Sequence, residues 1–188
     1  MDYSMMVSSP CLVSFSTQGN ISMFFPMYDN KYTLKLEEEL FGAWNCFSKD
    51  GWLLLFQGEG SMFFFNLFTK TRIELLDFQH DDGFDAFCFT STPTSLDCIV
   101  FGICSDCYKV KIFITHVGDE RWIVYHLKNK KRWSVFNCIK RSVSFNPVFY
   151  GGLFYCLDEQ EKLGYFDPEV GRWTVSRTSW RLDVWKYD

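Results

Sequence analysis

Apolar residues along this chain come in short, almost unbroken runs that are separated by polar turns. Residues 52–56 and 62–65 are two such runs, and Gln57-Gly58-Glu59-Gly60 stands between them. Short apolar runs that end at turn residues are typical of strands that are buried on both faces. Residues 34–41 are the single candidate for a helix, and we interpret them as a connecting turn. The pattern predicts a structure that is almost entirely β.

Two segments share the same order of features, which indicates an internal repeat. Residues 51–74 and 152–175 each begin with glycine, continue as an aromatic and aliphatic strand, cross a polar turn and enter a second strand. Gly51 precedes Asn66 by 15 residues, and the same distance separates the glycine at 152 from Asp167. We therefore expect the residues after both glycines to begin equivalent strands in equivalent sheets.

Weaker copies of the second half of this repeat occur at residues 23–36 and 123–136. They place Pro26 and His126 at the position of the closing polar residue, which gives successive intervals of 40, 60 and 41 residues. Two intervals are close to the ~40–50 residues of a four-stranded propeller blade. The long interval contains turn-rich sequence that can hold an insertion. The chain is thus predicted to form successive four-stranded antiparallel sheets.

Composition fits a large core and excludes some classes of partner. The 188 residues are enough for one domain, or for a fragment of a larger repetitive one, and 47% of them are hydrophobic. The formal net charge of −4 argues against a nucleic acid or an anionic membrane as partner. The first residues lack the basic and apolar regions of a secretory signal, and no apolar run is long enough to span a bilayer. We expect a cytoplasmic or nuclear location.

The eight cysteines do not form a convincing redox or metal motif. Without a secretory signal we expect reduced thiols that pack as small apolar residues. Cys104 and Cys107 form a CxxC, but the sequence after it is strand-like, whereas a redox pair needs a helix there. We interpret the motif as a hairpin turn and expect neither bound metal nor a cofactor.

Catalytic constellations are equally weak. His80 and Asp82 form an HxD that His126 could complete as the two-His-one-carboxylate set of an iron-dependent jelly-roll oxygenase. The HxD lies in turn-like sequence, however, and no Gly-x-Ser-x-Gly or phosphate-binding glycine loop occurs. Residues 128–132 are basic, and we interpret them as a solvated hairpin turn. We expect no catalytic residues, and the oxygenase is kept as an alternative.

Three motifs in order resemble the kelch-like β-propeller domain of plant F-box proteins: SKDGWLLL at 48–55, FFFNLFTKTRIEL at 63–75 and VFYGGLFYCLDEQEKLGYFDPEVGRWTV at 148–175. The resemblance covers roughly residues 10–178. It implies an all-β, kelch-like propeller, whole or partial, with about four blades' worth of sheets. It also implies a non-catalytic module that binds an unknown target protein for an F-box-type ubiquitin ligase adaptor.

Nothing in the chain resembles the helical F-box, so binding of the ligase adaptor is not expected from this chain alone. A truncated fragment that is non-functional or competes with full-length relatives is a further alternative. Propeller partners bind at loops on one end of the ring. The four candidate loops are 57–60, 79–85, 104–107 and 158–161. Their candidate partner-binding residues, mostly acidic and suited to a basic patch, are Gln57, Glu59, His80, Asp81, Asp82, Asp85, Asp106, Asp158 and Glu159.

Overall fold

The computed structural model describes residues 10–15, 20–35, 40–79, 83–106, 108–129, 133, 146–158 and 162–179. These form two compact units, Met1–Gln79 and His80–Asp188, which we describe separately. The described residues contain fifteen strands and one short 3₁₀ helix, η1 (Pro26–Tyr28). Among them, no helix is long and apolar enough to cross a membrane. The prediction of an all-β chain is confirmed.

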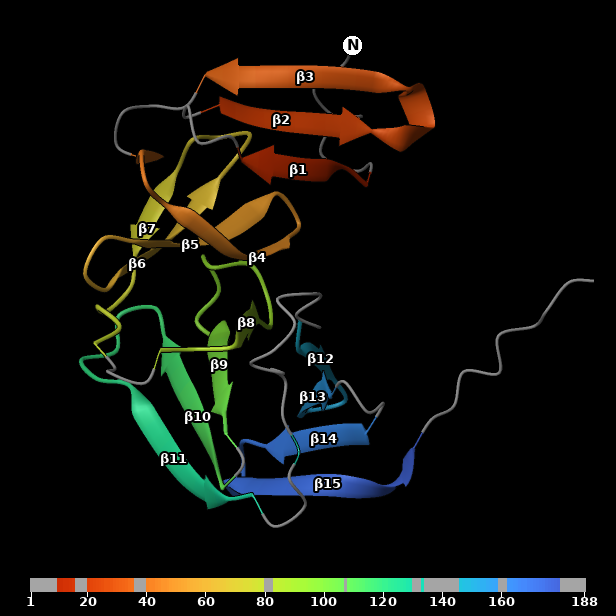
Figure 1. Ribbon diagram of the computed structural model, residues 1–188. Helices are drawn as coiled ribbons and strands as arrows, with labels where there is room; N and C mark the ends of the chain where they lie inside the picture. Colours follow the sequence, from red (N-terminus) through yellow and green to blue (C-terminus); the bar gives the residue numbers. More distant parts are fainter. Residues whose placement is uncertain are drawn as a thin grey trace, which may run out of the picture. The chain divides into compact units, whose positions relative to one another are not determined.

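The first unit contains two antiparallel sheets (Figure 1). The three-stranded sheet consists of β1 (Leu12–Phe15), β2 (Asn20–Phe25) and β3 (Asn30–Lys35), and the four-stranded sheet of β4 (Trp44–Lys49), β5 (Trp52–Gln57), β6 (Ser61–Asn66) and β7 (Arg72–Glu74).

Strands β5 and β6 are buried on both faces, as the apolar runs predict. Leu53 lies opposite Phe65, and this face of the pair belongs to a core cluster with Ile21 and Phe25 of β2. Phe64 lies on the other face and is also fully buried. Each phenylalanine that is fully removed from water contributes about 1.5–3 kcal/mol, which explains why the chain places three in succession here.

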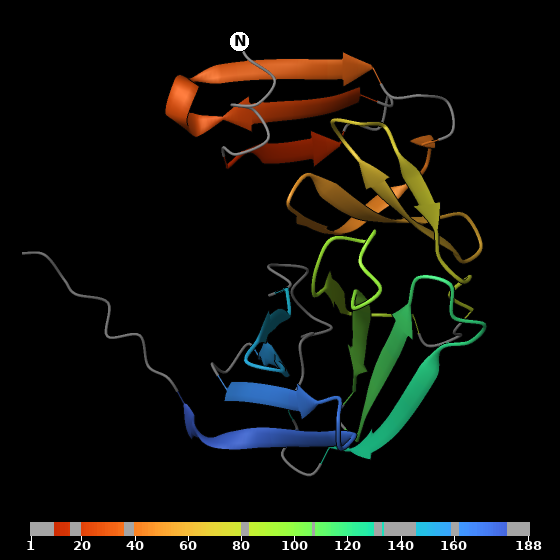
Figure 2. The same ribbon diagram turned by 180° about the vertical axis from the view of Figure 1, so that it is seen from behind.

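The second unit contains two four-stranded antiparallel sheets. One consists of β8 (Ala86–Phe89), β9 (Ile99–Ser105), β10 (Lys109–His116) and β11 (Ile123–Lys128); the other consists of β12 (Val148–Tyr150), β13 (Leu153–Leu157), β14 (Lys162–Asp167) and β15 (Arg172–Ser179). Within this unit β8 lies beside β12, while β11 and β15 are the outer strands, as two opposite views show (Figures 1 and 2).

Aromatic rings join the two sheets of the second unit face to face. Phe101 of β9 stacks on Phe154 of β13 with ring centroids 4.4 Å apart, and Tyr125 of β11 contacts Phe166 of β14 edge-on at 5.0 Å. Offset-stacked and edge-to-face pairs of this kind add about 0.5–1.5 kcal/mol each to the free energy of burial. Stacking of one sheet on the next is the packing that the repeat predicts.

The predicted equivalence of the two strong repeats is confirmed. Trp52 and Leu153 begin β5 and β13, the second strands of their sheets, and Asn66 and Asp167 end the third strands. Both polar side chains accept hydrogen bonds from the turn that follows. Asn66 Oδ1 accepts from the N–H groups two and three residues later, both at 2.9 Å, and Asp167 Oδ1 does the same at 3.0 and 3.4 Å. An Asx cap of this type fixes the exit from the strand, so both repeats need Asn or Asp there.

The predicted equivalence of His126 is wrong. His126 lies inside β11, where it pairs with Lys111 of β10, and the third strand of this sheet ends at His116. Asp119 accepts a hydrogen bond from the His116 N–H at 2.7 Å and so closes this hairpin from the other side of the turn. The repeat alignment is wrong here because the capping residue of this sheet, Asp119, lies beyond the turn and not at the end of the strand. Of the helical candidate, residues 34 and 35 belong to β3, whereas 36–39 lie outside the described residues.

Candidate functional site

The strand ends that border the four predicted loops are at the equivalent end of their sheets. In an antiparallel meander, the connection between the second and third strands points the same way as the entry to the first strand. Residues 57–60, 104–107 and 158–161 connect second and third strands, and 79–85 leads into the first strand β8. We call this end of the second unit, formed by the described residues around Asp85, 104–108, 129, 133, 158 and 162, the loop end.

In the first unit, the predicted residues have different exposures and roles. Glu59 is exposed in the turn between β5 and β6. Gln57 is half-buried, and its Nε2 donates a hydrogen bond to the carbonyl of Phe41 at 2.8 Å. Gln57 therefore fixes the segment before β4, whereas the Glu59 carboxylate is accessible from solvent.

Asp85 fastens the entry of β8 to the end of β9. Its Oδ2 accepts hydrogen bonds from the N–H and the hydroxyl of Ser105, at 2.6 and 2.8 Å. Burial raises the pKa of this carboxyl above its ordinary value, although the two bonds from Ser105 lower it. The carboxylate thus positions the β9–β10 hairpin, which contains the predicted loop 104–107.

Asp106 builds the tip of that hairpin. Its Oδ1 accepts hydrogen bonds from the N–H groups of Tyr108 and Lys109, both at 2.6 Å, which is the geometry of an Asx turn. The side chain of Tyr108 is 79% exposed on this fixed backbone. An exposed tyrosine on a rigid turn is a residue type that anchors protein interfaces, because it offers a large contact area at a low cost in side-chain entropy.

The thiol beside this tip is not activated. Burial, and then the neighbouring carboxylates of Asp85 and Asp106, raise the pKa of Cys104 to about 11, so the thiol is protonated at neutral pH. Cys107 lies outside the described residues. The strand expected after the CxxC is confirmed as β10, and the described cysteines, Cys104 among them, are reduced thiols.

Asp158 holds the turn between β13 and β14 from inside. Its Oδ1 accepts a hydrogen bond from the Lys162 N–H at 2.7 Å, and the side chain is only 2% exposed. A carboxylate at this depth stabilises the turn and cannot face a partner. Glu159 lies outside the described residues.

The remaining predicted site residues, His80, Asp81 and Asp82, also lie outside the described residues. His126 is exposed on β11. Over the described part of the chain, no group of three or more His, Cys, Asp and Glu residues is placed to hold a metal ion. Of the basic run, Lys128 ends the outer strand β11, and residues 130–132 lie outside the described residues.

Asn129 and Trp133 join the loops of the two sheets, and sequence reasoning missed them. The Asn129 amide nitrogen donates hydrogen bonds to the carbonyls of Asp106 and Trp133, and its Oδ1 accepts from the Trp133 N–H at 2.9 Å. The Trp133 indole N–H then donates to the Lys162 carbonyl at 3.0 Å, in the neighbouring sheet. We call this pair the clasp. Both side chains are buried, so the clasp fixes one loop against the other.

Gly164 of β14 provides the surface on which the clasp rests. A Cβ built on Gly164 would overlap the Trp173 ring and would lie 3.1 Å from Cε2 of Trp133. The two indoles meet edge-on with centroids 4.7 Å apart. Only glycine leaves room here for both rings, so β14 is matched in shape to the clasp.

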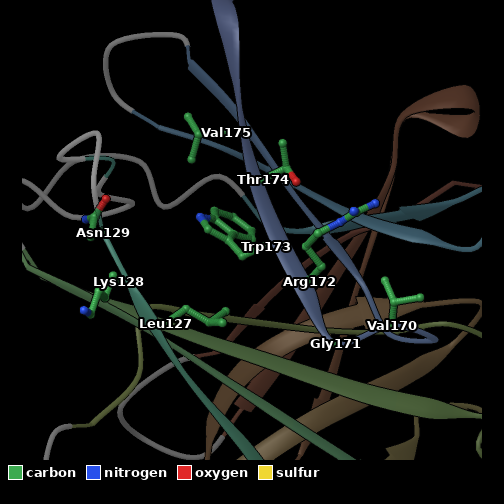
Figure 3. A pocket seen from close by; sticks show the side chains of 9 residues that line it. All are labelled: Leu127, Lys128, Asn129, Val170, Gly171, Arg172, Trp173, Thr174 and Val175. Atoms are coloured by element: carbon green, nitrogen blue, oxygen red, sulfur yellow. The ribbon is translucent and has the colours of Figure 1, made fainter.

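Trp173 also belongs to a groove between the outer strands β11 and β15 (Figure 3). The groove has a volume of about 640 Å³ and is lined by Leu127, Lys128, Asn129, Val170, Gly171, Arg172, Trp173, Thr174 and Val175. No acidic residue is among them. The sequence could not indicate this groove, because its two walls are far apart along the chain.

Comparisons with known proteins agree with this architecture. A family model described as KIB1-4 beta-propeller matches residues 21–183. The F-box/kelch-repeat protein At1g57790 of Arabidopsis thaliana is 32% identical over 170 residues, which are 89% of this chain and 46% of that protein. The F-box/kelch-repeat protein At3g18720 of the same plant is 32% identical over 164 residues, 84% of this chain and 41% of that protein. The chain spans less than half the length of these curated relatives.

Solved structures are similar only at a distance. The alignment with the crystal structure of BamB from Moraxella catarrhalis covers 91% of this chain and 50% of the BamB chain, at 13% identity and a TM-score of 0.39. This similarity is too low to bear on function. The match of the family model across most of the sequence, together with the successive antiparallel sheets, is decisive. The chain belongs to the KIB1-4 beta-propeller family.

Proposed function

We propose that this chain is a non-catalytic protein-binding module, the target-binding propeller of an F-box-type ubiquitin ligase adaptor, and that it acts in the cytoplasm or nucleus. The F-box and kelch-repeat names of its relatives support this assignment. The proposed binding surface in the second unit is the loop end, and the partner is a protein.

One observation carries the proposal: hydrogen bonds of side chains hold the described residues of the loop end in place. Asp85, Asp106 and Asp158 use their carboxylates to hold backbone N–H groups, and the clasp joins the two sheets at the same end. A partner that binds residues held in this way avoids the entropy of ordering them, which for each immobilised side chain is about 0.5–1.5 kcal/mol. These carboxylates already accept hydrogen bonds from the protein backbone, so they are not available to act on a substrate. The arrangement therefore suits partner recognition better than catalysis.

This role for the carboxylates changes the expected partner contact. The Asp85 and Asp158 side chains bind backbone groups, so the predicted acidic residues are not all available to attract a basic partner. The structure gives more support to a contact in which the exposed Tyr108 anchors the partner. The exposed tyrosine at the hairpin tip is the residue that we expect to bury most area in the complex.

The experiment uses two tyrosines of nearly equal exposure at opposite ends of the second unit. Tyr108 is 79% exposed at the loop end, and Tyr150 is 76% exposed as the last residue of β12, at the other end. Proteins retained from a plant extract by immobilised residues 1–188 are identified, purified and titrated against the wild type, Tyr108→Ala and Tyr150→Ala.

We expect Tyr108→Ala to weaken binding at least tenfold and Tyr150→Ala to change it less than twofold, with both variants folded by circular dichroism. The assignment fails if no purified protein binds saturably, or if the loss follows Tyr150 instead. The ligase subunit to which an F-box docks should not be retained by residues 1–188 when it is purified and tested in the same way. Robust retention would contradict the proposal that these residues bind only the target protein.

A further inference from the structure

The groove between β11 and β15 has the size of a ligand site. Its volume of about 640 Å³ lies within the roughly 300–1,000 Å³ of typical binding pockets. The two strands run side by side along it: a Cβ on Gly171, just before β15, would lie 2.7 Å from Cε1 of Tyr125 on β11. Further along, Leu127 faces Trp173 across the groove in Figure 3.

Both walls are edge strands. In the strand orders β11-β10-β9-β8 and β12-β13-β14-β15, β11 and β15 each stand at the end of a sheet. Every second residue of an edge strand directs its backbone N–H and C=O groups away from its own sheet. Such an edge is the surface to which an extended peptide adds as a further strand.

The floor of the groove is apolar. Leu127, Val175 and the Trp173 ring supply this surface. An apolar floor with a few polar groups at its rim is typical of sites that bind one apolar side chain of a partner.

The charges around the groove are positive. Lys128 and Arg172 line it, and no carboxylate does. Lys128 also lies directly opposite Lys109 in the ladder between β10 and β11, and the next pair on the same face is Lys111 opposite His126. Like charges directly opposite each other in a sheet are destabilising. Neither Lys109 nor Lys128 forms an ion pair with a described residue, and the Asp106 carboxylate before β10 accepts hydrogen bonds from backbone N–H groups.

We propose that this groove binds an extended acidic segment of a protein partner. Carboxylates of the segment lie beside Lys128 and Arg172, and an apolar side chain contacts Leu127 and Trp173. The inference rests on the proposed function, a protein-binding module, and adds the chemistry of the partner. The repulsion between Lys109 and Lys128 is relieved in the complex, which explains why a chain of net charge −4 keeps two lysines face to face.

The test uses three fluorescent probes and fluorescence anisotropy. The first is an eight-residue peptide of alternating Glu and Val, the second carries Lys in place of Glu, and the third is a single-stranded oligonucleotide with the charge of the first. We expect the acidic peptide to bind with an affinity that falls as salt is raised from 50 to 300 mM, because exposed charges are screened. The basic peptide should not bind, and the oligonucleotide should bind more weakly than the acidic peptide.

Charge reversal separates function from folding. Lys128→Glu places an acidic residue opposite Lys109, so this variant should melt at a higher temperature than the wild type while binding the acidic peptide at least tenfold more weakly. Arg172→Glu should weaken binding by a similar factor. The matched control is the exposed pair Lys31→Glu and Arg121→Glu, which lowers the net charge without touching the groove and should alter binding less than twofold.

The proposal is overturned if the acidic peptide does not bind, if Lys128→Glu binds it as the wild type does, or if the oligonucleotide binds more tightly. Failure here is distinct from failure of the proposed function. A purified partner whose binding depends on Tyr108 but not on Lys128 would support the loop end and refute the groove. Loss of peptide binding in Lys128→Glu would support the groove whatever the outcome at Tyr108.

Discussion

Replacing Asn129 by alanine tests whether the clasp holds the loop end together. The side chain is 7% exposed, and it donates to the carbonyls of Asp106 and Trp133 while accepting from the Trp133 N–H. Alanine removes all three bonds and keeps the backbone bond from Asn129 N–H to the Tyr108 carbonyl, at 2.8 Å. The perturbation is therefore confined to the side-chain amide.

The expected loss follows from these bonds. A buried N–H group left without a partner, here that of Trp133, costs about 1–3 kcal/mol, and each lost bond to a carbonyl removes a further ~0.5–1.5 kcal/mol. Water that enters the space left by the amide offsets part of this sum. We expect the free energy of unfolding to fall by about 2–4 kcal/mol, a large share of the roughly 5–15 kcal/mol of an ordinary domain. Asn129→Asp should lose at least as much, since a carboxylate cannot donate to the two carbonyls.

Urea unfolding followed by tryptophan fluorescence measures this quantity, and Asn45→Ala is the control because Asn45 is exposed on β4. The control should stay within about 0.5 kcal/mol of the wild type. If Asn129→Ala also stays within that margin, the three bonds do not stabilise the fold, and the clasp cannot be what orders the loop end.

Three further outcomes are expected. Gly102→Ala should destabilise the chain by about 1–3 kcal/mol, because a Cβ there would overlap the fully buried Phe87 ring; Phe87→Leu in the same chain should restore part of the loss in urea unfolding. Burial of the Asp119 carboxylate acts to raise its pKa, but hydrogen bonds from the N–H and imidazole of His116 hold the pKa below the ordinary value. The carboxylate therefore stabilises the fold above pH ~4, and this stabilisation is lost as pH falls through the pKa of the folded state. The difference in stability between wild type and Asp119→Asn should therefore shrink in acid, and a constant difference would contradict the ion pair. At pH 8 about one Cys104 thiol in a thousand is ionised, because its pKa is about 11, so maleimide labelling mapped by mass spectrometry should be slow at Cys104 in the native protein and fast in urea.

The sequence predicted the sheets well where caps and apolar runs coincide. Residues 51–75 combine a glycine before the strand, two runs of apolar residues and an Asx cap, and each signal is local, so the hairpin could be recognised without its surroundings. The third sheet was placed less well. Its third strand ends at His116, and the cap comes from Asp119 beyond the turn. The repeat alignment therefore chose the wrong strand when it placed His126 at the closing position.

The sequence indicated the turns that contain the candidate site residues, but it did not indicate what the acidic side chains in those turns do. Acidic residues in turns are as typical of Asx caps as of exposed binding surfaces, and only the hydrogen bonds of Asp85 and Asp158 distinguish the two. The clasp and the groove depend on residues that meet only after two sheets have stacked. Asn129 followed by Trp133 was the only local sign, and neither residue is unusual in a loop.

Gly164 couples the clasp to the groove, because it contacts a tryptophan of each. Without this glycine, the two could change independently between species. Both indoles rest on the face of β14 that its missing side chain leaves open. A relative that carries a larger residue at this position must also have replaced at least one of the two tryptophans, whereas a relative that keeps both must keep glycine. Among natural sequences, positions 133, 164 and 173 should therefore change together. Relatives should have both the loop end and the groove, or neither.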